Sequence, residues 1–153
     1  MTPEEINALV ANQRAFFNSG ATLDMAGRLR ALRELRAAIV TYQDVIAAAL
    51  QKDLGKSATE SAMCEIGMVK SALNHMLRHA TRYAKTKHVR TPLAQMPARS
   101  MRKPAPFGVV LVMSPWNYPF LLTMEPLIEA LAAGNTVVVK PSAYSLHTSA
   151  LLE

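Results

Sequence analysis

Two short apolar runs separated by a helix-length segment constrain the fold of this chain more than any other feature. The runs are Gly108-Val-Val-Leu-Val-Met113 and Thr136-Val-Val-Val139. Continuous apolar, β-branched runs are typical of strands buried on both faces of a parallel sheet. Between them, a helix is predicted from about Phe120 to Gly134-Asn135, with its core face at Leu121, Leu122, Leu127, Ile128 and Leu131. A strand, a helix and a strand within about 35 residues predict a right-handed βαβ unit with parallel strands.

The first forty residues carry signals for two helices. Thr2 and Glu5 form a capping box, and Asn18-Ser19-Gly20 ends the helix that follows. A second helix is expected from near Thr22, with Thr41-x-x-Asp44 as a restart signal. Its period places one set of residues inward, namely Met25, Leu29, Leu32, Leu35 and Ile39, and a basic set outward, namely Arg28, Arg30, Arg33 and Arg36.

A long helix is expected next, running from Ser57-x-x-Glu60 into the eighties, after Leu54-Gly55 ends the preceding one with Gly55 in the left-handed conformation. Its apolar stripe is Ile66, Val69, Leu73, Met76, Leu77 and Tyr83. His75 and His79 lie four residues apart, but no acidic residue or cysteine completes a metal site, so we predict none. Cys64 is interpreted as a core or boundary residue, and a lone cysteine fits a reducing cytoplasm.

The middle of the chain is strongly basic. Between Ile66 and Met124 there are nine Lys and Arg residues and no Asp or Glu. Such a segment suits nucleic acid, but no nucleic-acid motif accompanies it, and a solvated face or a surface for an acidic partner is favoured. Within it, extended pieces near Val89 to Thr91 and Arg99 to Lys103 predict a hairpin around Leu93 to Pro97. No apolar run reaches the length of a membrane-spanning helix, so no membrane span is expected.

The residues that follow the two predicted strands suit a ligand site. Parallel strands share a carboxyl edge, so Ser114-Pro115-Trp116-Asn117 and Lys140-Pro141-Ser142 should converge there. The Lys140 ammonium group donates to hydroxyl or phosphate oxygens, and the Asn117 amide donates to an oxygen that gains charge. Structural roles remain open at this point: Asn117 as a helix cap, Trp116 as a core residue, and Lys140 as a cation directed to solvent.

Two motifs resemble a known family. The stretch Pro106-Phe-Gly-Val-Val-Leu-Val-Met-Ser-Pro-Trp-Asn-Tyr-Pro-Phe120, followed by Ala132-Ala-Gly-Asn-Thr-Val-Val-Val-Lys-Pro-Ser142, closely resembles the aldehyde dehydrogenase superfamily, above all its class three branch. Asp53-Leu-Gly-Lys56 is similar too, and the resemblance covers essentially all 153 residues. It implies an α/β fold with N-terminal helices (1–88), a hairpin of the oligomerisation element (89–104) and the first βαβ unit of a Rossmann-like sheet (105–153), together an incomplete domain.

The resemblance also implies roles for individual residues. Asn117 matches the asparagine that stabilises the tetrahedral oxyanion, and Lys140 matches the lysine that binds the adenosine ribose of NAD or NADP. Ser114, Pro115, Trp116 and Ser142 line the same cofactor cleft. At Ala143, many relatives carry a Glu that accepts hydrogen bonds from the ribose, so we expect this chain to differ in its choice of cofactor.

The implied activity is oxidation of an aldehyde to a carboxylic acid by an N-terminal portion of such an enzyme, which forms a homodimer at full length. In the family mechanism a cysteine thiolate adds to the aldehyde and a glutamate activates water. The 153 residues contain no counterpart of those segments, and Cys64 matches neither, so this chain alone is expected to be inactive. The alternatives are a related acyl-phosphate or acyl-CoA reductase and, outside enzymes, a basic helical binding module.

Overall fold

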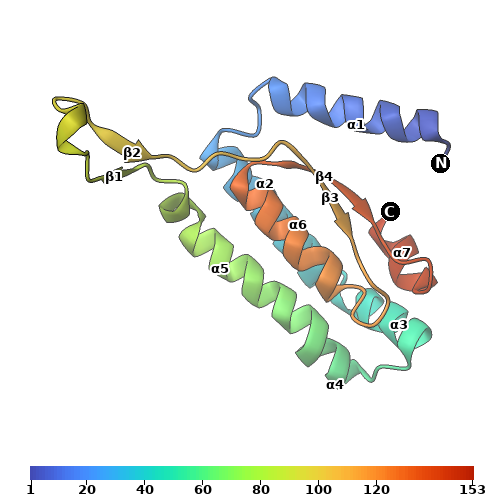
Figure 1. Ribbon diagram of the computed structural model, residues 1–153. Coiled ribbons are helices and arrows are strands. Elements are labelled where there is room, and N and C mark those ends of the chain that lie inside the picture. The colour runs from blue at the N-terminus through green and yellow to red at the C-terminus, as the bar shows by residue number, and fades with distance from the viewer.

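The computed structural model describes residues 1–153 as a helical body, a two-stranded parallel sheet and a projecting hairpin (Figure 1). The strands are β1 (Lys87–Val89), β2 (Ser100–Arg102), β3 (Val109–Met113) and β4 (Thr136–Lys140). The helices are α1 (Pro3–Asn18), α2 (Met25–Thr41), α3 (Gln43–Leu54), α4 (Ala58–Ser61), α5 (Gly67–Tyr83), α6 (Leu121–Ala133) and α7 (Leu146–Leu152), with a π-helical turn η1 (Ala62–Ile66) and a 3₁₀ turn η2 (Leu93–Gln95).

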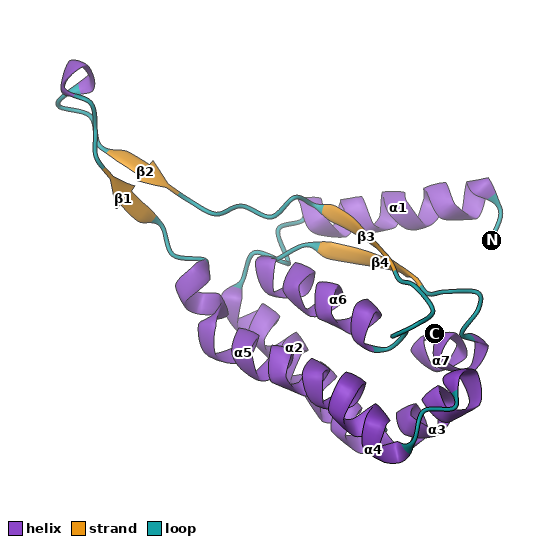
Figure 2. Ribbon diagram, turned by 60° about the horizontal axis from the view of Figure 1, so that its bottom comes forward, coloured by secondary structure: helices purple, strands orange, loops and turns teal.

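The βαβ unit predicted from the two apolar runs is confirmed. β3 and β4 pair in parallel, with Val109 opposite Thr136 and Met113 opposite Lys140, and α6 connects them. Helix α1 lies on one face of this sheet and α6 on the other, with α2 and α5 beyond α6 (Figure 2). The helix ends at Gly134, as the sequence predicted, and the φ of 92° at this residue is the left-handed conformation that is common after the last helical turn.

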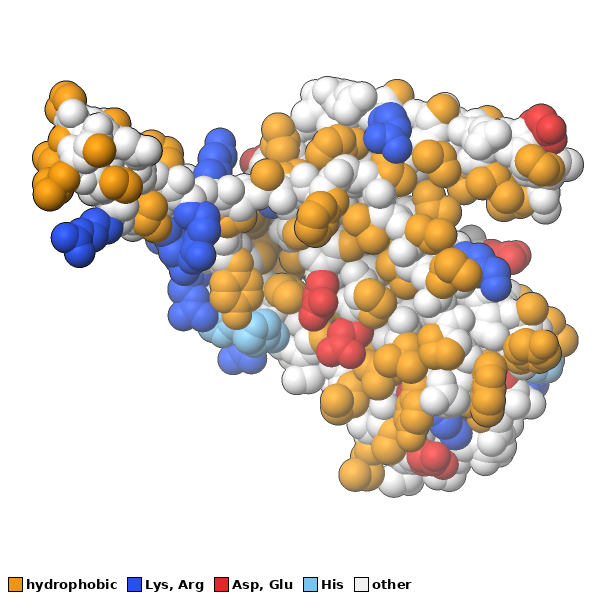
Figure 3. Space-filling view, viewed as in Figure 1, with side chains coloured by type: hydrophobic (Ala, Val, Ile, Leu, Met, Phe, Trp, Pro, Cys, Tyr) orange, Lys and Arg blue, Asp and Glu red, His pale blue; other side chains and the backbone are white.

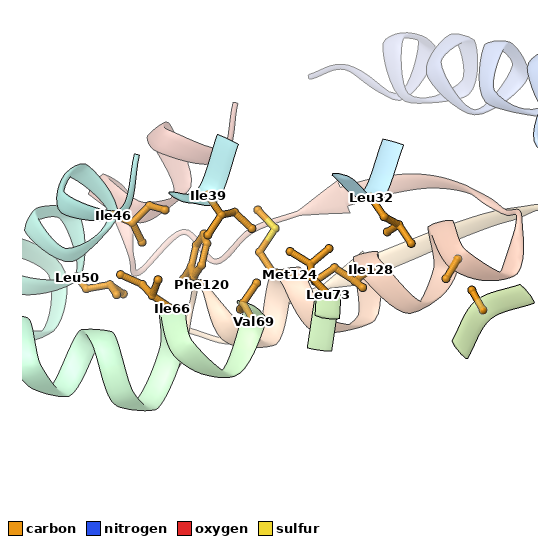
Figure 4. Close-up of a cluster of buried hydrophobic side chains, with 12 residues drawn as sticks. Leu32, Ile39, Ile46, Leu50, Ile66, Val69, Leu73, Phe120, Met124 and Ile128 are labelled. Atoms are coloured by element: carbon orange, nitrogen blue, oxygen red, sulfur yellow. The ribbon is translucent and has the colours of Figure 1, made fainter. Parts of the chain in front are cut away.

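The hydrophobic core lies between α6 and the helices α2, α3 and α5 rather than in the sheet (Figure 4). One row of α6, at four-residue spacing, faces this core: Phe120, Met124, Ile128 and Ala132. Of the predicted core face of α6, Ile128 belongs to this row, and Leu121, Leu127 and Leu131 are partly buried against the same core, so the prediction is largely confirmed. The helix lies between two layers and is apolar on most of its circumference. The prediction that both faces of β3 are buried is wrong for Leu111 and Met113, which are exposed. Only α1 covers that side of the sheet here.

The N-terminal helices follow the predicted signals in part. The Thr2–Glu5 capping box is present, and Gly55 ends α3 with a φ of 69°. Helix α2 begins at Met25, with Asp24 and not Thr22 at its start, because the Asp24 carboxylate accepts the first free N–H groups of that helix. The predicted restart near Thr41 is confirmed, because α3 begins at Gln43, but no side chain caps its start.

Arg28 was expected to point outward, and the structure corrects this. Its guanidinium group donates to the carbonyls of Thr22, Leu23, Ala132 and Ala133, and so joins the start of α2 to the end of α6. The last carbonyls of a helix have no partner within the helix, which is why a cation there is stabilising. Burial lowers the pKa of Arg28 from its ordinary value, partly offset by Asp24.

The long helix after Ser57 forms, but it is not a regular α-helix. Ser57 caps it by accepting the N–H of Glu60, as predicted, and the π-helical turn η1 then interrupts it. Cys64 lies on this turn and is exposed, so the prediction of a core or boundary position is wrong. The wider π turn rotates Glu65 and Ile66 toward the core instead.

The predicted hairpin is confirmed as the antiparallel pair β1–β2, which projects away from the body (Figure 1). Its first strand spans Lys87–Val89, earlier than the predicted 89–91, and ends before Thr91, whose side chain accepts the N–H of Ser100. Basic side chains gather where the hairpin meets the body (Figure 3). None of the helices combines the length and the apolar character needed to cross a membrane.

Candidate functional site

The two turns that follow β3 and β4 leave the sheet side by side. Ser114, the first residue after β3, donates its N–H to the carbonyl of Lys140 over 3.3 Å, which extends the parallel ladder by one bond. The structure therefore brings the predicted residues Ser114–Asn117 and Lys140–Ala143 to one edge of the sheet. In open α/β sheets this carboxyl edge is where ligands bind.

Ser114 is fixed by a short hydrogen-bond chain. The Thr123 hydroxyl lies 2.6 Å from the Ser114 hydroxyl oxygen and 2.5 Å from the carbonyl of Pro119. Because Thr123 is fully buried on the first turn of α6, this chain joins the end of β3 to the start of the helix. The turn 114–119 is thus held at both ends.

Asn117 does not cap α6. The helix has Phe120 at its start and no side-chain cap from the preceding turn. The N–H groups of Phe120 and Leu121 are instead taken by the carboxylate of Glu65, at 2.9 and 3.1 Å. Asn117 itself is exposed, so its amide is not required for the helix and is accessible to a ligand.

Trp116 does not take the structural role left open by the sequence, whereas the exposure of Lys140 fits both a ligand contact and a cation directed to solvent. Trp116 is 55% exposed and does not fill the core, so its ring is available as an apolar wall. Lys140 is exposed at the end of β4, where its neighbours in the strand are three valines. A cation at this edge donates hydrogen bonds to hydroxyl or phosphate oxygens of a ligand, or to water.

The turn after β4 is tightly structured. Ser142 is buried, its hydroxyl accepts the N–H of Tyr144, and its carbonyl accepts the hydroxyls of Ser145 and Ser149. Ala143, between Ser142 and Tyr144, is exposed. The Ser142 side chain is therefore engaged in the turn, while position 143 faces solvent at the sheet edge.

Helix α7 is capped from a distance by Asp53 at the end of α3. The Asp53 carboxylate accepts the N–H of His147 at 2.9 Å and both the N–H and the hydroxyl of Thr148 at 2.7 Å. Burial raises the pKa of this carboxyl, but the hydrogen bonds from His147 and Thr148 outweigh burial and hold the pKa below its ordinary value. The contact anchors the turn after β4 to the helical body.

A buried ion pair that was not predicted from the sequence lies beside the site. Lys56 and Glu65 pair with each other, and both side chains are buried. Lys56 Nζ also donates to the Asn117 carbonyl at 3.1 Å and lies 3.8 Å from the centroid of the Tyr118 ring. A signal was present: Glu65, Val69 and Leu73 share one helical face at four-residue spacing, and a charge within an apolar stripe points to a specific partner.

The two histidines of α5 are not part of this edge. His75 Nε2 is 2.9 Å from the Tyr83 hydroxyl, and the ring centroids of His75 and His79 lie 4.5 Å apart. The structure contains no group of three His, Cys, Asp or Glu residues arranged to hold a metal ion. The exposed Lys140 and Asn117 side chains at the carboxyl edge of the sheet are hydrogen-bond donors, which suit oxygen-rich, anionic groups.

The chain is similar to one protein family along its whole length. The model of the aldehyde dehydrogenase family matches residues 1–153. The chain is 43% identical over 131 residues to 4,4'-diaponeurosporen-aldehyde dehydrogenase of Staphylococcus aureus, covering 86% of this chain and 28% of that protein. It is 37% identical to aldehyde dehydrogenase family 3 member H1 of Arabidopsis thaliana, covering 97% of this chain and 31% of that protein.

Solved structures agree with this match. The substrate-bound state of Staphylococcus aureus AldH superposes with a TM-score of 0.92 at 38% identity, covering 99% of this chain and 33% of that one. The chain therefore spans about a third of the length of the relatives that it matches.

Proposed function

Because the chain belongs to the aldehyde dehydrogenase family, we propose that the protein carrying it oxidises an aldehyde to a carboxylic acid, with NAD or NADP as the hydride acceptor. The observation that carries this proposal is the pairing of the two turns, in which the Ser114 N–H binds the Lys140 carbonyl. That bond sets Asn117 and Lys140 at one carboxyl edge, as a reaction between an aldehyde and a dinucleotide requires.

Asn117 is the proposed oxyanion donor. When a nucleophile adds to an aldehyde carbon, the carbonyl oxygen becomes an anion, and a side-chain amide held in advance stabilises that charge. The Asn117 side chain is exposed at the site, and its backbone is held through its carbonyl by Lys56. Exposure with a fixed backbone is what a donor of this kind needs.

Lys140 and the residues around it are the proposed cofactor contacts. The ammonium group of Lys140 is a hydrogen-bond donor that suits the ribose hydroxyls, and the exposed Trp116 ring together with Pro115 and Ser114 offers a wall of the cleft. Ser142 shapes the turn that presents position 143. The donor set therefore fits a dinucleotide, which when bound accepts the hydride from the substrate carbon.

The hairpin β1–β2 is the proposed oligomerisation element of a homodimer. Both strands are short and largely exposed, and each has a free edge that can pair with another chain. Several of the basic residues of the middle segment lie on or beside this hairpin, which gives them a role other than binding nucleic acid. A single cysteine suits the reducing cytoplasm, which is the location that we propose.

The test is aldehyde-dependent formation of NADH or NADPH by the purified protein that contains this chain. The aldehyde panel includes a long apolar aldehyde, because one relative is named for 4,4'-diaponeurosporen-aldehyde. Reduction of either cofactor with aldehyde, and none without it, supports the proposal. Activity only with acyl-phosphate or acyl-CoA substrates would instead favour the related reductases.

A further inference from the structure

Apart from the bond between them, Lys56 and Glu65 make all their side-chain hydrogen bonds to the segment 117–121, where the turn after β3 meets α6. Lys56 Nζ donates to the Asn117 carbonyl at 3.1 Å, and Glu65 Oε2 accepts the N–H groups of Phe120 at 2.9 Å and Leu121 at 3.1 Å. The Tyr118 ring lies against the same ammonium group. One ion pair therefore contacts four of the five residues from Asn117 to Leu121.

A buried ion pair contributes little to the net free energy of folding. Removing two charges from water costs about as much as their attraction returns, and apolar residues of the same size often stabilise a core better. Here the pair is more than nine-tenths buried, and each partner is satisfied by backbone groups of the turn. The pattern indicates that the pair fixes a backbone conformation.

The backbone of the long helix is shaped to deliver Glu65 to this place. Glu65 lies on the π-helical turn η1, and Gly67 is the first residue after that turn. A Cβ atom at Gly67 would lie 2.6 Å from the carbonyl oxygen of Ala62, so only glycine fits this turn without a shift. Single π turns within α-helices occur frequently at functional sites.

We propose that Lys56 and Glu65 are positioning residues for the Asn117 amide, acting by holding the backbone from which that side chain projects. The inference rests on the proposed oxyanion role of Asn117. Lys56 holds the carbonyl of Asn117 itself, and Glu65 holds the helix start three and four residues later. A displacement of about 1 Å at a reacting group lowers a rate by roughly a hundredfold, so loosening this turn reduces turnover.

The experiment combines a double-mutant cycle with hydrogen exchange, both on the complete protein that carries this chain. Lys56→Met is made in the wild type and in an Asn117→Ala background. We expect Lys56→Met to lower kcat by roughly tenfold to a hundredfold in the wild type and by less than about twofold when Asn117 is already alanine. Cofactor affinity should change less than kcat, because the proposed Lys140 contact lies in the turn after β4, to which neither Lys56 nor Glu65 is hydrogen-bonded.

Hydrogen exchange reads the same turn without relying on activity. In the wild type the amides of Phe120 and Leu121 should be strongly protected, and Lys56→Met should speed their exchange relative to amides of the β3–β4 ladder. The matched control is Arg28→Met, which removes a partly buried cation from the other end of α6. At temperatures at which the Arg28→Met variant is folded, it should have the kcat of the wild type and the same exchange rates at Phe120 and Leu121.

A second variant covers the case in which Lys56→Met does not fold. Lys56→Met combined with Glu65→Gln leaves no unpaired charge, and the glutamine oxygen still accepts the N–H groups of α6. This variant should fold, yet lose the hold on the Asn117 carbonyl and lower kcat as Lys56→Met does.

Equal losses of kcat from Lys56→Met in both backgrounds, or unchanged exchange at Phe120 and Leu121, would overturn the positioning role. Failure of the oxyanion proposal has a different signature: Asn117→Ala alone would then retain its kcat, whatever the exchange data show.

Discussion

Met113 at the end of β3 lies directly opposite Lys140 at the end of β4 in a parallel register. A register shifted by one residue would send every side chain of one strand to the opposite face and separate the two turns that follow. The exposed Asn117 and the exposed Lys140 share one edge because this register holds.

Replacing Asn117 by alanine tests the oxyanion donor. Loss of one preorganised donor costs about a hundredfold to a thousandfold in kcat, or roughly 3 to 4 kcal/mol of transition-state stabilisation. We expect Asn117→Ala to lower kcat by that amount and to leave cofactor affinity nearly unchanged, as measured by steady-state kinetics and cofactor titration. The matched control is Asn12→Ala on the exposed face of α1, which should behave as wild type. A normal kcat in Asn117→Ala would show that the exposed amide takes no part in catalysis.

Replacing Gly67 by alanine tests the π-helical turn. In a regular helix, alanine is more favourable than glycine by about 1 kcal/mol. Here the added Cβ atom would lie 2.6 Å from the Ala62 carbonyl oxygen, and overpacking of this kind costs about 1 to 3 kcal/mol. We expect the clash to prevail, so that Gly67→Ala lowers the free energy of unfolding in a denaturant titration. Its control is Gly27→Ala on α2, where the nearest atoms lie at 3.3 Å or more. A stabilised Gly67→Ala would mean that η1 relaxes to an α-helix without cost.

The elements that the sequence predicts well are those with local signals. The Thr2–Glu5 capping box, the left-handed Gly55 and the helix end at Gly134 depend only on neighbours in the chain. The parallel β3–β4 pair followed from two apolar runs and the length of the segment between them. The turns that carry the candidate site could therefore be placed at one edge before any coordinates were known.

Two of the features that the sequence misplaced or missed, Arg28 and the Lys56–Glu65 pair, depend on partners far along the chain. Arg28 has the spacing of an outward residue, yet it binds carbonyls of α6 more than a hundred residues away. The signal Ser57-x-x-Glu60 marks the start of a helix but carries no information about the π turn that follows. The Lys56–Glu65 pair was missed because its partners at Asn117 and Phe120 follow from the packing of α5 against α6.

Asp53 makes the stability of the fold depend on pH. Its pKa lies below the ordinary value in the folded state, although burial opposes this shift, because His147 and Thr148 donate to the carboxylate. A depressed folded pKa contributes stability that is fully present above the unfolded pKa of about 3.9 and is lost as pH falls through the folded pKa. We expect Asp53→Asn to lower the free energy of unfolding at pH 7, because the neutral amide oxygen accepts weaker hydrogen bonds than the carboxylate, and to lower it less at about pH 3.

The measurement for Asp53 is a pair of denaturant titrations, one at each pH, on the wild type and the variant. Glu34→Gln on the exposed face of α2 is the control for loss of a carboxylate and should change little at either pH. A cost for Asp53→Asn that stays constant between the two pH values would show that the hydrogen bonds to α7 do not require the charge.

Ala143 is the basis of a prediction about cofactor choice. It is exposed in the turn after β4, three residues beyond Lys140. The resemblance to aldehyde dehydrogenases implies that many relatives have Glu at this position. An acidic residue there accepts hydrogen bonds from the ribose of NAD and repels the 2′-phosphate of NADP. Alanine removes a charge-assisted hydrogen bond worth about 1.5 to 3 kcal/mol to NAD, together with the repulsion of NADP. We therefore expect the protein to use NADP at least as well as NAD, and Ala143→Glu to shift the preference toward NAD.

The preference is measured as kcat/KM for both cofactors in the wild type and in Ala143→Glu. The control is Ala143→Gln, which supplies a hydrogen-bonding side chain of the same length without the charge. Because only the charge repels the 2′-phosphate, Ala143→Gln should retain NADP, whereas Ala143→Glu should lose it. The two variants thus separate repulsion of NADP from hydrogen bonding to NAD. A wild type that strongly rejects NADP would contradict the prediction and assign the choice of cofactor to a residue other than position 143.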